Sequence, residues 1–143
     1  MFIPGLNFST APAVTTSPNN ITIEYNSTSS AGTKNATFLC AFNGDPLPAV
    51  EWFKGSLQLS GSSKYSVSSD GTNSSVLKIN NVDVNDIGSY ACNVSNNESS
   101  VLASASLGVV GMFMKFVFSD RCVQMLLPNI ITDFSCKLLS IMI

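Results

Sequence analysis

The chain has 143 residues, a net charge of −2 and only 11% charged residues, well below the average of about 25% for soluble domains. It contains no histidine, which removes the commonest acid–base group and the His-containing triads and zinc sites, and no glycine-rich phosphate loop follows a strand and opens a helix. Nothing in it is basic enough to follow a phosphate backbone, so we expect neither an enzyme nor a nucleic-acid-binding protein, with no cofactor and no metal.

The N-terminal part of the chain has the composition of a flexible segment. Residues 1–11 are expected to be flexible, and Ser9 to Pro18 is rich in Thr, Ser, Ala and Pro, as in a lead-in or a polar linker. The first five residues lack a basic region, and Pro4 interrupts their apolar run, so they do not form a secretory signal. Because the Asn-x-Ser/Thr triplets of the chain predict glycosylation in a secretory compartment, we interpret the chain as a fragment of a longer secreted or cell-surface protein.

Five later segments alternate apolar and polar side chains with the period of two that a half-buried β-strand requires. The side chains predicted to point inward are Phe38, Cys40 and Phe42; Val50 and Trp52; Leu77 and Ile79; Tyr90, Cys92 and Val94; and Ala103, Ala105, Leu107 and Val109. Both Cys40 and Cys92 are therefore expected to point into one interior.

Turn-forming residues fall between these segments. The stretch 44–48 contains two prolines, which predicts the connection into the Trp52 strand. Asp70 and Gly71 predict a tight turn, and Asn80 to Asp86 predicts a polar corner before Tyr90.

Cys40, Trp52 and the run Asp86-Ile87-Gly88-Ser89-Tyr90-Ala91-Cys92 together resemble the signature of immunoglobulin-like domains, in which a Tyr lies two residues before the second Cys. The Gly-x-Pro-x-Pro stretch that precedes Trp52-Phe53-Lys54 is similar to the intermediate, or I-set, type. The resemblance covers residues 12–110 and implies an all-β, Greek-key sandwich of two antiparallel sheets. The interval from Trp52 to Leu77 leaves room for two short strands but little for the extra strand of a variable-type domain.

The resemblance also implies roles for individual residues. A disulfide between Cys40 and Cys92 would join the two sheets, with Trp52 packed against it. Tyr90 would bond back to the backbone at the corner, and Gly88 would allow the tight bend there. Asp86 would form a salt bridge with Lys64, at a position where the family more often has Arg.

Seven Asn-x-Ser/Thr triplets with a non-proline middle residue occur in the chain, which marks them as N-glycosylation acceptors. Either several carry glycans added in a secretory compartment, or the Asn- and Ser-rich composition inflates their number. Strand alternation predicts that Asn93 faces outward on the sheet carrying Trp52 and that Asn97 lies at a hairpin tip. Beyond Asn7, the candidates are Asn20, Asn26, Asn35, Asn73, Asn93 and Asn97.

Glu51 and Phe53 face outward on the Trp52 strand and are the best contact candidates that such glycans would leave uncovered. The alternative for Phe53 is an aromatic side chain that covers the edge of the sheet without binding anything.

Residues 111–143 form an apolar tail that is predicted to be poorly ordered or appended to the domain. Charged residues and Pro128 interrupt its apolar runs, whereas a spanning helix needs about 20 apolar residues. A transmembrane helix, an unfolded extension and an appended helix or strand are the alternatives. Cys122 and Cys136 could bridge each other, pair with another chain or stay free.

These features predict a non-catalytic recognition or adhesion module of an extracellular or cell-surface glycoprotein or receptor. It would bind a protein ligand, homophilic or heterophilic, with membrane association through flanking segments or the tail. One alternative is a structural spacer in a string of domains. Another is an intracellular I-set scaffold domain with Cys40 and Cys92 reduced, which the low charge and the many acceptor triplets argue against.

Overall fold

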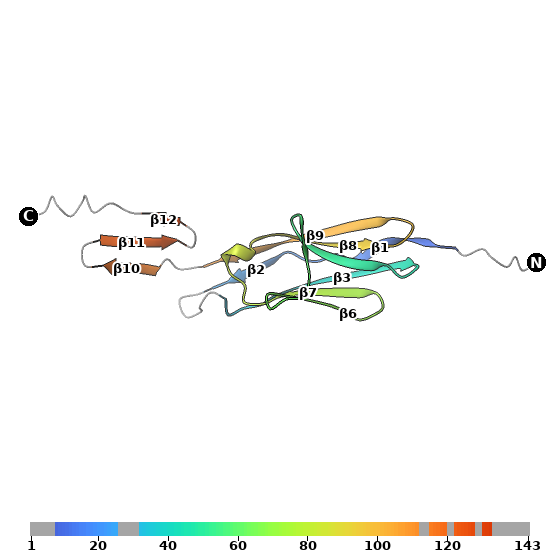
Figure 1. The fold of residues 1–143 in the computed structure, drawn as a ribbon, viewed down its shortest axis with the longest axis horizontal. Coiled ribbons are helices and arrows are strands. Elements are labelled where there is room, and N and C mark those ends of the chain that lie inside the picture. The colour runs from blue at the N-terminus through green and yellow to red at the C-terminus, as the bar shows by residue number, and fades with distance from the viewer. Residues whose placement is uncertain (1–7, 26–31, 112–114, 120–121, 128–129, 133–143) are drawn as a thin grey trace, which may run out of the picture.

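The computed structural model describes residues 8–25, 32–111, 115–119, 122–127 and 130–132. In this part of the chain two β-sheets face each other, and a smaller third sheet follows them (Figure 1). The predicted all-β sandwich is confirmed.

The first sheet of the sandwich has four antiparallel strands in the order β1–β3–β7–β6. Their bounds are Thr10–Thr16 for β1, Ala36–Asp45 for β3, Ser74–Ile79 for β7 and Tyr65–Ser69 for β6.

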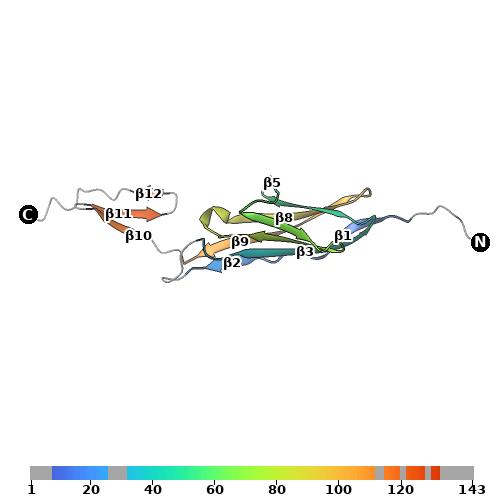
Figure 2. The same ribbon diagram turned by 60° about the horizontal axis from the view of Figure 1, so that its bottom comes forward.

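The second sheet has five strands in the order β2–β9–β8–β4–β5. Figure 2 labels β2, β9, β8 and β5 of this sheet. Neighbouring strands are antiparallel except for β2, which runs parallel to β9, so this sheet is not antiparallel throughout as the sequence suggests. The bounds are Ile21–Glu24 for β2, Ser100–Val110 for β9, Gly88–Ser95 for β8, Ala49–Lys54 for β4 and Leu57–Leu59 for β5.

The prediction of a flexible lead-in from Ser9 to Pro18 is wrong. Residues 10–16 form the edge strand β1, whose pairing with β3 is irregular where Pro12 interrupts it, and edge strands tolerate proline because one side needs no ladder donor. Pro12 and Pro18 are both buried. Strand β1 thus pairs with the first sheet, and after Pro18 the chain pairs with the second sheet as β2.

The core lies between the two sheets and contains the predicted inward-facing side chains. Trp52, Leu77, Ile79, Tyr90 and both cysteines are fully buried, and the remaining predicted positions are buried or pack partly buried against this cluster. The alternation therefore identified the inner faces correctly, because each of these strands has one face on the core and one in water.

The chain enters and leaves the sandwich at opposite ends. Strand β1 begins beside the turn that joins β3 to β4, because Thr10 pairs with Asp45. Strand β9 ends beside β2, where the Tyr25 N–H donates to the Val110 carbonyl at 3.0 Å. Figure 1 shows these two points at the two ends of the long axis.

Beyond β9 the described residues form a small antiparallel sheet of β10, Lys115–Ser119, β11, Cys122–Leu127, and β12, Ile130–Thr132. Cys122 opens β11 and pairs with Ser119, while Cys136 lies outside the described residues. In the part of the chain that the structure describes, no helix has the length and apolar character that crossing a membrane requires.

Candidate functional site

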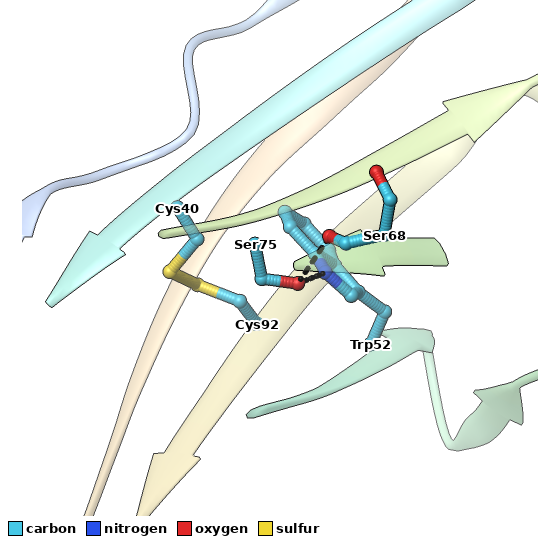
Figure 3. Close-up of a disulfide and its surroundings, with 5 residues drawn as sticks. All are labelled: Cys40, Trp52, Ser68, Ser75 and Cys92. Atoms are coloured by element: carbon cyan, nitrogen blue, oxygen red, sulfur yellow. Dashed lines mark hydrogen bonds between the residues drawn. A yellow bond between two sulfur atoms is a disulfide. The ribbon is translucent and has the colours of Figure 1, made fainter. Parts of the chain in front are cut away.

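A disulfide joins Cys40 on β3 to Cys92 on β8 and so links the two sheets (Figure 3). The sulfur atoms are 2.11 Å apart, the Cα atoms are 6.6 Å apart, and neither residue is exposed to solvent. This confirms the pairing implied by the sequence.

Trp52 packs beside the disulfide and is tied to the opposite sheet. It pairs with Cys92 across β4 and β8, while Ser75 pairs with Cys40 across β7 and β3. The indole Nε1–H donates to Ser75 Oγ at 3.0 Å, and the Ser75 hydroxyl donates to the Ser68 carbonyl at 3.3 Å, as Figure 3 shows. The sheets are therefore joined by a hydrogen-bond chain as well as by a covalent bond.

The sequence analysis predicted no role for Ser75, although its position in the strand indicates that its side chain points inward. It occupies the same parity on β7 as Leu77 and Ile79 and is only 2% exposed. A serine at an inward position must find a partner, because an unsatisfied buried polar group is costly.

The variant Ser75→Ala is expected to lower the free energy of unfolding by about 1–3 kcal/mol, because it leaves the Trp52 N–H buried without an acceptor. Urea unfolding followed by circular dichroism measures the effect. Ser104→Ala, on the exposed face of β9, is the matched control and should leave the midpoint unchanged. Equal midpoints for the two variants would contradict the role of Ser75.

Tyr90 closes the corner before β8. Its hydroxyl donates to the Asp86 carbonyl at 2.8 Å, and burial raises the pKa of Tyr90 well above its ordinary value. Gly88 has φ of +152°, a conformation that residues with a Cβ rarely adopt. The Tyr90 contact and the Gly88 bend thus have the geometry that the resemblance implies.

Asp86 is a buried carboxylate, only 2% exposed, and its charge is fully partnered. Its Oδ2 lies 2.5 Å from Lys64 Nζ and accepts from the Asp83 N–H at 2.8 Å. Asp83 caps the short 3₁₀ helix Val84–Asp86 in return, and Lys64 Nζ also donates to the Asn81 carbonyl at 2.8 Å. All of these contacts join residues of the same region, from Lys64 to Asp86. The charges therefore have a structural role at the corner before β8.

Tyr90→Phe is expected to change how stability depends on pH. Because the pKa of Tyr90 is raised in the folded chain, its contribution is present below about pH 10 and is lost as the pH rises further. The variant loses one buried hydrogen bond, at a cost of about 1–3 kcal/mol near neutral pH, but it cannot ionise. Urea midpoints should therefore converge with those of the wild type above about pH 10, and a gap that stays constant would contradict the assignment.

The outward face of the second sheet carries a surface formed by Glu51, Phe53, Asn93 and Leu102, which we call the β4–β8–β9 surface. Asn93 is paired with Glu51 on one side and with Leu102 on the other. Glu51 is exposed and its Oε1 accepts from Gln58 Nε2 at 2.8 Å. Leu102 is 63% exposed and Phe53 is partly exposed.

This register changes the interpretation of Glu51 and Phe53. Directly paired side chains lie about 4.5–5.5 Å apart at Cβ and diagonal ones about 7–8 Å apart. Asn93 is the direct neighbour of Glu51, and Phe53, which pairs with Ala91, is on its diagonal. A glycan on Asn93 would therefore lie directly beside both contact candidates and would not leave them uncovered.

Two other acceptor asparagines hold the backbone through their side-chain oxygen. Asn20 Oδ1 accepts from the Ser106 N–H at 2.8 Å, and Asn35 Oδ1 accepts from the Asn81 N–H at 3.0 Å. Both residues are exposed. These contacts leave the Nδ2 atom, which would carry a glycan, unused by the bond.

Asn73 and Asn97 lie in turns at one end of the sandwich. Asn73 Nδ2 donates to the Phe42 carbonyl at 3.1 Å, so its acceptor nitrogen is engaged. Asn97 is exposed in the connection between β8 and β9. Asn7 and Asn26 lie outside the described residues.

Comparison with known proteins agrees with this architecture. The family model of the immunoglobulin I-set domain matches residues 12–109. The chain is 40% identical over 75 residues to mouse (Mus musculus) roundabout homolog 1 and 31% identical over 100 residues to smooth muscle myosin light chain kinase of Gallus gallus. These matches cover 52% and 70% of this chain but only 4% and 5% of the two relatives.

A solved structure of titin domain M7 has the same fold, with a TM-score of 0.64 and 27% sequence identity. The alignment covers 73% of this chain and 98% of that domain. The matched region contains the disulfide, the buried Trp52 and the Tyr90 corner described above. The chain belongs to the immunoglobulin I-set family.

Proposed function

We propose that the chain is a non-catalytic, extracellular recognition domain that binds a protein ligand through the β4–β8–β9 surface. The observation that carries the proposal is Leu102, a large apolar side chain that is 63% exposed on the outward face of a sheet. Phe53 lies across the same face and Glu51 is close by. Exposed apolar patches mark interaction sites, and aromatic residues are enriched in protein–protein interfaces. A partner that offers an apolar side chain and a basic group opposite Glu51 therefore fits this face.

The disulfide supports the extracellular location. Such bonds form and persist in oxidising compartments and are rare in the cytosol. Several acceptor asparagines on the surface support the same location, because glycans are added in the secretory pathway. Membrane association would then come from flanking segments or from the tail.

The test is binding of the secreted full chain, after enzymatic removal of its N-glycans, to a panel of secreted ectodomains and to itself. Phe53→Ala and Leu102→Ala are expected to weaken binding at least about tenfold, which is 1.4 kcal/mol, and Glu51→Ala to weaken it chiefly at low salt. Leu39→Ala is the matched control, since Leu39 is 44% exposed on the opposite sheet. Equal effects of all four changes, or no partner at all, would favour a structural spacer.

One observation favours a second candidate, an intracellular I-set scaffold domain. The similarity to smooth muscle myosin light chain kinase covers 70% of the chain, a larger share than the similarity to roundabout homolog 1. Alkylation of the natural protein, denatured as the cells are lysed, separates the two candidates. Alkylated Cys40 and Cys92 would support the intracellular scaffold domain, and an intact disulfide would support the extracellular domain.

A further inference from the structure

We propose that Asn93 carries an N-linked glycan and that its occupancy closes the β4–β8–β9 surface to protein partners. The inference rests on the proposed function, because it identifies what controls access to the same surface. Its physical basis is the position of one acceptor asparagine among the side chains that would bind.

Asn93 lies on the middle strand of the three that form the surface. Strand β8 has β4 on one side and β9 on the other, and the pairs Glu51–Asn93 and Asn93–Leu102 place its side chain between the other two. Its neighbours Cys92 and Val94 are fully buried, so the alternation of the strand turns Asn93 toward solvent. Any group attached to it leaves the sheet between Glu51 and Leu102.

The amide of Asn93 is available for modification. Among the described residues its side chain makes no hydrogen bond, in contrast to Asn73, whose Nδ2 donates to the Phe42 carbonyl. Ser95, the hydroxyl residue of the triplet, follows with the same parity on β8 and is partly exposed. The triplet is therefore presented as an extended segment on an open sheet face.

The chemistry is a glycosyl transfer from an oligosaccharide linked to a lipid pyrophosphate, the donor class of the secretory pathway. Asn93 Nδ2 loses one proton and forms a bond to C1 of the first N-acetylhexosamine, and the lipid pyrophosphate departs as the leaving group. The sugar then lies over Phe53 and Leu102, and its C–H face removes apolar surface from water.

The test uses the full chain secreted from cells that add N-glycans. Glycosidase release in heavy-oxygen water marks each occupied asparagine by mass, and hydroxyl-radical labelling reports the exposure of Phe53 and Leu102. Ser95→Ala removes the triplet but keeps Asn93, and Ser95→Thr preserves it. Labelling of Phe53 and Leu102 should be several-fold lower in the wild type and in Ser95→Thr than in Ser95→Ala, with Leu39 labelled equally in all three.

Two results would overturn the inference. One is an unmodified Asn93 in material whose Asn97 or Asn20 is occupied. The other is an occupied Asn93 with unchanged labelling of Phe53 and Leu102. The proposed function fails separately, when no partner is sensitive to Phe53→Ala in the Ser95→Ala background, and that outcome leaves the labelling result intact.

Discussion

Replacing Cys40 and Cys92 together with alanine is expected to lower the free energy of unfolding by about 4 kcal/mol. The two cysteines are separated by 52 positions, and closing a loop of this length lowers the conformational entropy of the unfolded chain. Small domains have total stabilities of about 5–15 kcal/mol. The double variant should therefore be marginal at 37 °C and folded only near the temperature of maximum stability.

Urea unfolding at low temperature, followed by circular dichroism, measures this loss. Wild-type protein that is unfolded in reductant and refolded with its thiols blocked by a small alkylating group provides an independent comparison. Single replacement of Cys40 should cost about as much as the double replacement, because either one breaks the bridge. A double variant with the wild-type midpoint would show that the bridge contributes nothing to stability.

Trp52→Ala is expected to lower the free energy of unfolding by about 3–5 kcal/mol, because it opens a large cavity between the sheets. Trp52 is fully buried, Phe38 lies with its ring centroid 6.4 Å from the indole, and Ser75 loses its donor. Trp52→Phe should cost less, since it keeps an aromatic ring but loses the hydrogen bond and part of the volume.

The matched control is Phe53→Ala at the next position of β4, where the side chain is partly exposed on the outer face. It should cost less than half as much as Trp52→Ala. Because Trp52 is the single tryptophan of the chain, unfolding must be followed by circular dichroism and not by tryptophan fluorescence. Equal losses for Trp52→Ala and Phe53→Ala would contradict the assignment of inner and outer faces.

The part of the fold that could be predicted from sequence is the part with strong alternation and distinctive residues. A period of two is clear for Phe38, Cys40 and Phe42. The positions of Trp52 and Tyr90 relative to the two cysteines are typical of an immunoglobulin-like core. Strand β1 escaped prediction because prolines and small polar residues weaken its pattern, and because its stability comes from pairing with β3 and not from local propensity.

Contacts between segments distant in sequence were also beyond prediction. The Tyr25 hydroxyl donates to the Val82 carbonyl at 2.7 Å, across 57 positions, and no local sequence pattern specifies this contact. The conflict between Asn93 and Glu51 required the register of β4 against β8. Alternation shows which face a side chain occupies, but only strand pairing shows which side chains are neighbours on that face.

The positions at which the chain enters and leaves the sandwich have a consequence for any longer protein that contains it. Because β1 begins at one end of the sandwich and β9 finishes at the other, domains fused before and after it would be arranged in a row along its long axis. Neighbouring domains would then occupy both ends of the sandwich. A binding partner would therefore approach from the side, at the face that carries Asn93.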